Sequence, residues 1–218
     1  MNSKEFVESL ARENQEILDR LGPTETLEAD DPHLDLVVLL KMALKNELEA
    51  TELAARWMET TEDIQVKLAF ARQIGDEAKH YRMIQDRLKD LGVNTDEFNP
   101  VAQGYSPLFN SLVTLTDTVE RVSGAQFTRE AIATVKNQQF VELCTARGDE
   151  VTARMYRDTI QVDEGYHHLL GRRLLERLAT TPEAQERARK VARKTLELAE
   201  ELQNAVREKA GIHHAPGC

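Results

Sequence analysis

Two short stretches of this sequence constrain the fold more than any other feature. They are Asp76-Glu77-Ala78-Lys79-His80 and Asp163-Glu164-Gly165-Tyr166-His167, and both have the form Asp-Glu-x-x-His. Positions i and i+3 lie on one face of a helix, so each stretch points a glutamate and a histidine in the same direction. Two such pairs that face each other in a helical bundle supply part of a site for two metal ions.

The apolar residues around these stretches recur with helical spacing, which predicts an all-α protein with a single domain, residues 1–218. We expect helices over 4–20, 33–59, 62–91, 108–147 with a break near Ser123-Gly124, 149–179 and 182–209. The first begins the chain, those within 33–179 form the bundle, and the last is a fifth, highly charged helix. Asp31-Pro32 and Ser106-Pro107 are predicted helix starts. The tail, 211–218, is expected to be disordered, and its His213-His214 pair is a poor metal candidate.

The composition narrows the classes of partner. The net charge of −10 disfavours binding to nucleic acid, since no basic face stands apart from the surrounding glutamates. The longest apolar run, Leu36 to Leu40, is too short to cross a bilayer, so no membrane partner is expected. The two cysteines form no disulfide framework, and the N-terminus has no signal-peptide core, which together predict a cytoplasmic protein.

A site for two metal ions in a helical bundle needs two further glutamates, one from each of the other two helices. Glu47 lies 30 residues before Glu77 and falls on the apolar stripe of its helix. Glu49 and Glu52 are the alternatives, but their positions point toward the charged side. Burying several carboxylates without a cation is very costly, which favours a metal site over a purely structural cluster.

Glu130 is the candidate from the second half of the chain. It lies 34 residues before Glu164, whereas the 87-residue offset between His80 and His167 would place the partner of Glu47 at Thr134. Glu130 therefore requires one turn of slippage or a π-type widening of its helix, a feature found at functional sites. Glu120 and Glu142 are the alternatives. A lone Glu-x-x-His is usually a surface pair, but its duplication here favours metal binding.

This set of residues resembles the ferritin-like di-iron carboxylate superfamily, in its oxygen-activating members, over about residues 33–179. The resemblance implies a ferritin-like four-helix bundle that holds two iron ions, or one manganese and one iron. The implied metal ligands are Glu47, Glu77, His80, Glu130, Glu164 and His167, with Glu77 and Glu164 as the bridges. It also implies that Asp76 and Asp163 each bond the opposite ligand histidine, and that Thr134 lies over an oxygen pocket.

The function implied by this resemblance is a di-iron oxidoreductase, an oxidase or oxygenase that uses dioxygen to oxidise a small organic substrate. Its electrons would come from a separate reductase, because the sequence has no flavin or iron–sulfur motif, and a homodimer is expected. Ile84 stands where the ribonucleotide reductase small subunit carries its radical tyrosine, which argues against radical storage. Two alternatives stay open: an iron-oxidising or peroxide-detoxifying protein, and a non-catalytic subunit that pairs with an active homologue.

Overall fold

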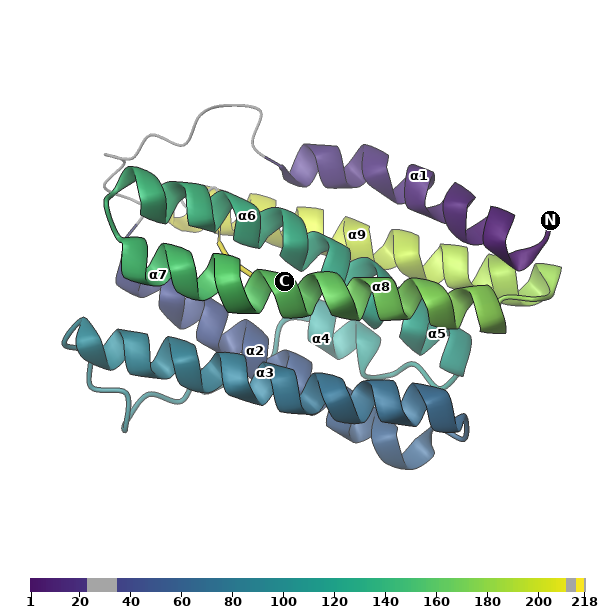
Figure 1. The fold of residues 1–218 in the computed structure, drawn as a ribbon, viewed down its shortest axis with the longest axis horizontal. Helices are drawn as coiled ribbons and strands as arrows, with labels where there is room; N and C mark the ends of the chain where they lie inside the picture. The colour runs from purple at the N-terminus through teal and green to yellow at the C-terminus, as the bar shows by residue number, and fades with distance from the viewer. Residues whose placement is uncertain (23–34, 211–214, 218) are drawn as a thin grey trace.

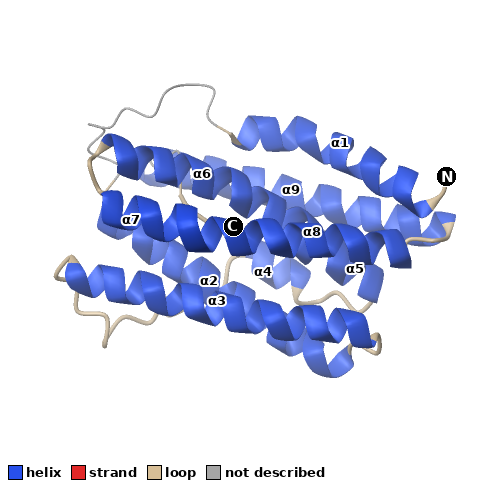
Figure 2. Ribbon diagram, viewed as in Figure 1, coloured by secondary structure: helices blue, strands red, loops and turns tan. Residues whose placement is uncertain are grey.

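The described part of the chain is helical. A computed structural model describes residues 1–22, 35–210 and 215–217, and Figure 2 shows helices joined by loops, with no strand within these ranges. The α-helices and the two π-helical segments, η1 and η2, are α1 (Ser3–Leu21), α2 (Leu36–Thr60), α3 (Ile64–Asp90), α4 (Pro107–Leu112), α5 (Thr118–Val122), η1 (Ser123–Arg129), α6 (Glu130–Ala146), α7 (Glu150–Met155), η2 (Tyr156–Ile160), α8 (Gln161–Leu178) and α9 (Pro182–Ala210). The all-α prediction is confirmed.

The long helices run roughly along one direction (Figure 1). α2 and α3 form an antiparallel pair joined by a short turn, as predicted from the loop at Thr60. α8 packs against α3 on one side and against η1 and α6 on the other. α1 packs against α6, α8 and α9, and α9 also packs against η1, α4 and α5. The fifth helix therefore packs on the rest of the molecule, one of the two arrangements that its apolar stripe allowed.

Local sequence explains where several helices begin. The Ser106 hydroxyl accepts a hydrogen bond from the Phe109 amide, and Pro107 occupies the first turn, as predicted. The helix predicted over 33–59 begins instead at Leu36, because the Asp35 carboxylate caps its first amides. The start expected at Asp31-Pro32 lies outside the described residues.

Two π-helical segments interrupt the second half of the chain. η1 ends at Arg129, immediately before Glu130, and η2 ends at Ile160, just before the Asp163-Glu164 stretch. A π-helical turn holds more residues than an α-helical turn, so it shifts the face presented by everything that follows it. The spacing of Glu130 indicated the first segment, whereas the second was not predicted.

The buried apolar side chains form two separate clusters. One gathers near the ends of α2 and α3 where Trp57 and Phe70 lie, and it includes α1 and α9. The other gathers around Leu44, Ile84 and Phe140 at the opposite ends of α2, α3 and α6. Along α2, Glu47 falls between residues of the two clusters, and so does Glu77 along α3. A buried polar layer therefore separates two apolar cores.

Close helix packing beside this layer depends on Gly171. A β-carbon on Gly171 would lie 2.6 Å from the Gln126 carbonyl and 2.7 Å from the Phe127 nitrogen, both backbone groups of η1. The absence of a side chain lets α8 approach η1, and so sets the position of Glu130 relative to Glu164.

The C-terminal tail corrects one expectation. Residues 215–217 are ordered rather than disordered, with Pro216 and Gly217 buried against α2 and α6. The Asn46 amide donates to the Pro216 carbonyl, and the Gly217 amide donates to the Asn137 side chain. The pair His213-His214 lies outside the described residues. Of the helices in the described ranges, none has both the length and the apolar character needed to span a bilayer.

Candidate metal centre

The structure brings the six predicted ligands together in the polar layer. They form what we call the carboxylate cluster: Glu47, Glu77, His80, Glu130, Glu164 and His167, none of which is more than 3% exposed. Glu47 comes from α2, the first Glu-His pair from α3, Glu130 from the start of α6, and the second pair from α8. Four segments distant in sequence thus converge on one buried point.

Within the cluster, two groups of four possible ligands overlap. The first group combines Glu47 and His80 with Glu77 and Glu164, and the second combines Glu130 and His167 with the same two glutamates. In each group the ligand atoms all lie within 4.8 Å of one another. Glu77 and Glu164 are common to both groups, which is the arrangement expected of carboxylates placed between two ions.

Each histidine turns its Nδ1 atom into the cluster. The Nδ1 of His80 lies 3.3 Å from an oxygen of Glu47 and 3.3 Å from an oxygen of Glu77. The Nδ1 of His167 lies 3.7 Å from an oxygen of Glu77 and 3.7 Å from the Oε2 of Glu164. This nitrogen and the Glu164 oxygen are both buried without a hydrogen-bond partner. A cation between two such atoms would satisfy both, so these residues fit a metal ion.

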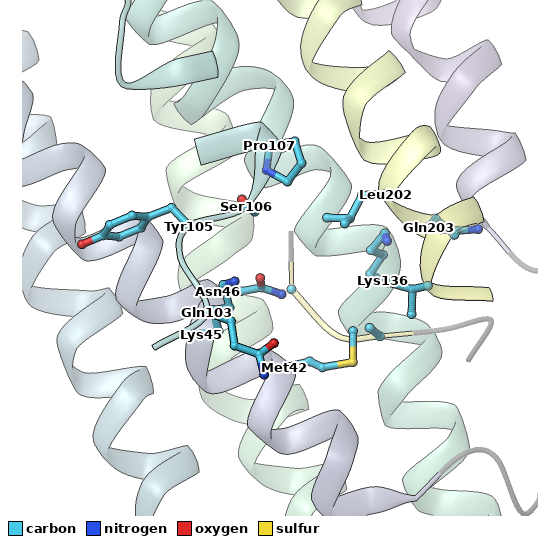
Figure 3. Close-up of a pocket in the computed structure, with 13 residues that line it drawn as sticks. Met42, Lys45, Asn46, Gln103, Tyr105, Ser106, Pro107, Lys136, Leu202 and Gln203 are labelled. Atoms are coloured by element: carbon cyan, nitrogen blue, oxygen red, sulfur yellow. The ribbon is translucent and has the colours of Figure 1, made fainter. Parts of the chain in front are cut away.

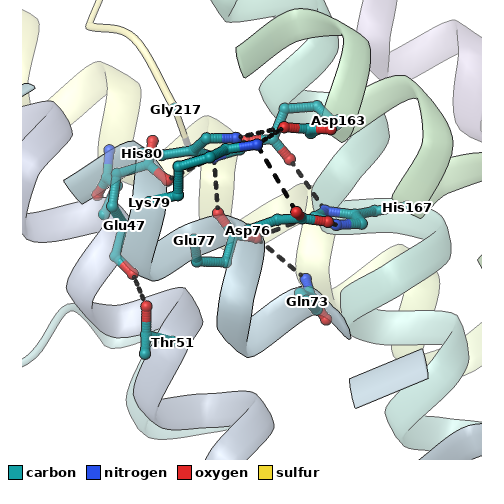
Figure 4. Close-up of polar contacts among 12 residues, drawn as sticks. Glu47, Thr51, Gln73, Asp76, Glu77, Lys79, His80, Asp163, His167 and Gly217 are labelled. Atoms are coloured by element: carbon teal, nitrogen blue, oxygen red, sulfur yellow. Dashed lines mark hydrogen bonds and ion pairs between the residues drawn. The ribbon is translucent and has the colours of Figure 1, made fainter. Parts of the chain in front are cut away.

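The other nitrogen of each histidine is held by an aspartate from the opposite helix (Figure 4). His80 Nε2 lies 3.1 Å from Asp163 Oδ2, and His167 Nε2 lies 3.1 Å from Asp76 Oδ2. Lys79 donates a hydrogen bond to Asp163, and Arg72 donates one to Asp76. These contacts orient the rings and keep Nδ1 directed inward, which is how a carboxylate positions a histidine ligand. The crossed pairing is the one that the resemblance implied.

Protons balance the charge when no ion is bound. Burial, together with the negative charges of Glu77 and Glu130, raises the pKa of Glu164 well above its usual range, which favours the protonated form of this side chain. Burial lowers the pKa of His80, but hydrogen bonds with Glu47 and Glu77 outweigh it and raise the pKa to about 12. Burial likewise opposes charge on His167, yet Glu130 and Glu77 raise its pKa to about 9. Cations that enter the cluster must displace these protons.

The stability of the metal-free protein should therefore fall between about pH 5 and pH 7. Burial raises the pKa of Glu47 from 4.5 to about 7, so the folded protein keeps a proton that the unfolded chain has lost. A folded state that binds more protons loses stability as the pH rises, here by about 3 kcal/mol from this group. Urea unfolding of chelator-treated protein at a series of pH values measures how the free energy of unfolding changes with pH. Glu47→Gln cannot titrate at this position and should make the decrease smaller, while the raised pKa of Glu164 still contributes to it. Stability that rises over this interval would contradict the assignment.

Sequence reasoning missed several groups around the cluster. The Gln73 amide donates to Glu130 at 2.6 Å and to Glu77 at 3.3 Å. Gln73 lies one helical turn before Glu77, so its place on the same face was a usable signal. Arg129 lies 3.8 Å from Glu130 and donates to the backbone carbonyl of Asn46. No local pattern pointed to Arg129, since its position depends on η1.

The alternative glutamates lie elsewhere. Glu142 is exposed and accepts a hydrogen bond from Gln138, while Glu120 lies on α5, away from the two groups of possible ligands. Glu52 accepts hydrogen bonds from Tyr105 and Arg56. Glu49 was expected on the charged side, but it is buried, because the Ser106 amide and hydroxyl need an acceptor there.

Thr134 is half-buried on α6, one turn beyond Glu130. Its hydroxyl donates to the Glu130 carbonyl at 2.8 Å, within its own helix. A cavity of about 10 Å³ lies among the four glutamates and is lined by Ala133 rather than by Thr134. The expected place of Thr134 over an oxygen pocket depended on the oxygenase assignment.

Comparison with known proteins identifies a solved structure with a similar fold. The sequence matches no protein-family model and no curated protein sequence. The structure is similar to the crystal structure of a TenA homologue from Pyrococcus furiosus, with a TM-score of 0.64 and 17% sequence identity. The match covers 89% of this chain and 96% of the TenA homologue. A likeness at this level of identity establishes the fold and no activity.

This likeness corrects the family assignment. The ferritin-like resemblance is wrong, and so are the di-iron oxidase or oxygenase function and the oxidoreductase class that it implied. The iron-handling and subunit alternatives rested on the same resemblance and fall with it. The physical reason is that paired Asp-Glu-x-x-His helices determine which side chains meet, but not how the helices are connected and covered. The sequence also predicted dioxygen, a reductase and a second copy of the chain as partners, and a cytoplasmic location. These stay predictions.

Proposed function

We propose that this protein is a metalloprotein whose carboxylate cluster holds two divalent cations. The observation that carries the proposal is the sharing of Glu77 and Glu164 between two complete four-ligand groups. Each group has its own histidine, and each histidine is fixed by its own aspartate. A cluster built only for structure would gain nothing from this duplicated set of buried charges, because burying an uncompensated carboxylate is costly.

The charges favour two ions rather than one. The four glutamates carry four negative charges when ionised, and two divalent ions neutralise them while both imidazoles stay neutral. A single divalent ion would leave two of these four charges to be balanced by protons or by Arg129, which lies 3.8 Å from Glu130. Arg72 and Lys79 pair with Asp76 and Asp163 at the edge of the cluster.

The donor atoms favour iron or manganese. The cluster offers carboxylate oxygens and two imidazole nitrogens and contains no thiolate; Cys144, the one cysteine in the described ranges, belongs to an apolar core. Mixed oxygen and nitrogen donors suit these ions better than soft metals that select sulfur. Two such metal ions, when bound, would supply Lewis-acid chemistry to a ligand or a water molecule. The residues of this chain supply the cage, the orientation of the imidazoles and the exclusion of bulk water.

Metal counting tests the proposal. Chelator-treated protein is incubated with ferrous or manganous ions under anaerobic conditions, desalted, and analysed by mass spectrometry for metal per chain. We expect two ions per chain with either metal, retained through desalting. Protein that keeps no ion would refute the metal centre, and protein that saturates at one ion would refute the dinuclear arrangement.

A further inference from the structure

The cavity shown in Figure 3 does not offer a free charge that would select a ligand. It has a volume of about 400 Å³ and is bounded by α2, α6, α9 and the loop before α4. In its wall, Lys45 donates to the Gly104 carbonyl and pairs with Glu49, and Lys136 also has a partner. The contacts that distinguish one half of the carboxylate cluster from the other lie instead between α8 and η1.

α8 does more than supply two of the predicted metal ligands. Two residues that follow this ligand pair, His168 and Gly171, contact η1. The Nδ1 of His168 lies 2.7 Å from the Phe127 carbonyl oxygen, which can only accept, so the ring donates this hydrogen bond. The His168 ring also stacks on the Phe127 ring, with centroids 5.0 Å apart and planes inclined by 22°. One helix therefore both provides metal ligands and holds η1.

The position of η1 determines where the Glu130 carboxylate lies. Phe127 precedes Glu130 by three residues, which is nearly one helical turn. The Glu130 amide donates to a carbonyl within η1, so the backbone of this ligand belongs to the same hydrogen-bonded segment. The start of η1 is held separately, because the Ser123 hydroxyl donates to the Ala188 carbonyl on α9. The His168 contact thus lies near the end of η1 that leads into the ligand.

This contact bears on one of the two four-ligand groups. Glu130 belongs to one group, whereas the other is made by residues of α2, α3 and α8 alone. Gln73 on α3 holds the Glu130 carboxylate at 2.6 Å, but it does not hold the Glu130 backbone. Loss of the His168 contact should therefore weaken the group that contains Glu130 in part, and leave the other group unchanged.

We infer that His168 is a positioning residue for the ion bound by Glu130 and His167, because its hydrogen bond to the Phe127 carbonyl fixes η1 against α8. The inference rests on the proposed metal centre for the ion, while the hydrogen bond itself belongs to the metal-free protein. Two substitutions separate the parts of the contact. His168→Phe keeps a stacking ring and removes the donor, whereas His168→Asn keeps a side-chain donor close to the position of Nδ1 and removes the ring.

The affinity of each ion is measured by titrating manganous ion into chelator-treated full-length protein, with the free ion followed by electron paramagnetic resonance. We expect His168→Phe to bind one of the two ions about tenfold more weakly, because a backbone carbonyl loses its donor and η1 is released. The other ion should keep its affinity. His168→Asn should restore the weakened ion, which a role in ring packing alone would not allow. Leu169→Ala, an exposed position on α8, should bind both ions as the unaltered protein does.

Hydrogen exchange of the metal-free protein tests the same contact without any ion. Peptides that cover residues 123–130 should exchange about tenfold faster in His168→Phe, and at the unaltered rate in His168→Asn and Leu169→Ala. The inference is overturned if exchange over 123–130 does not change, if the two ions weaken equally or not at all, or if His168→Asn behaves as His168→Phe does. Unaltered protein that keeps no ion would refute the metal centre instead, and the exchange rates would still decide whether His168 fixes η1.

Discussion

Replacing Glu77 with alanine is expected to abolish the binding of both metal ions. Glu77 belongs to each of the two four-ligand groups, so its loss leaves neither ion with a full set of donors. Removing one partner from a buried charge pair costs about 3–5 kcal/mol, and a loss of this size corresponds to a fall in affinity of roughly a hundredfold to several thousandfold for each ion. Glu164→Ala should behave in the same way.

Variants of the two glutamates that belong to only one group should retain a different number of metal ions. Glu47 belongs to one group and Glu130 to the other, so Glu47→Ala and Glu130→Ala should each retain one tightly bound ion. Glu142→Ala, an exposed glutamate of α6, should retain two. The measurement is metal per chain after anaerobic loading and desalting. If Glu77→Ala retains two ions, or loses no more than Glu47→Ala does, the bridging role of Glu77 is wrong.

Folding is separable from binding in these variants. Without metal, the neighbouring carboxylates repel one another, and this repulsion contributes to the raised pKa of Glu164. Removing Glu164 relieves that repulsion, so metal-free Glu164→Ala should unfold cooperatively. A variant that loses its ions while keeping its unfolding transition therefore reports on the site itself.

The second large effect is expected at Gly171, away from the ligands. Gly171→Ala would place a methyl group 2.6 Å from backbone atoms of Gln126, and backbone cannot move aside as a flexible side chain can. Overpacking of this kind costs about 1–3 kcal/mol, and we expect the upper end because two segments must separate. Chemical denaturation of metal-free protein measures the loss.

Gly75→Ala is the matched control for this substitution. Gly75 is exposed on α3, and a β-carbon there would meet nothing within 4 Å. Alanine is favoured over glycine inside a helix by roughly 0.5–1 kcal/mol, so this variant should be slightly more stable than the unaltered protein. Equal stability of Gly171→Ala and the unaltered protein would show that the contact between α8 and η1 is looser than the structure indicates.

Much of the helical framework was predictable, because apolar periodicity and capping residues act locally. The helix predicted over 62–91 is Ile64–Asp90, and the one predicted over 182–209 is Pro182–Ala210. The convergence of the six cluster residues was also predictable, since buried glutamates at helical spacing require partners. The 34-residue spacing before Glu164 even indicated the π-helical segment at Glu130.

The remainder depended on contacts between segments distant in sequence. Glu49 is buried because the Ser106 amide and hydroxyl, 57 residues away, need an acceptor. Nothing in the sequence around Glu49 indicates that requirement. Gly217 is ordered because Asn46 and Asn137 hold the tail. The η2 segment has no apparent local signal. The family assignment was the largest error, since a motif specifies neighbours and not the path of the chain between them.

The central claim is most directly tested by anomalous scattering from crystals of manganese-loaded protein. The account expects two peaks inside the carboxylate cluster, both in contact with Glu77 and Glu164. One peak should lie beside Nδ1 of His80 and the other beside Nδ1 of His167, with Asp163 and Asp76 still bonded to the opposite nitrogens. A single peak, peaks confined to the protein surface, or a cluster without metal in crystals grown with excess manganese would contradict it.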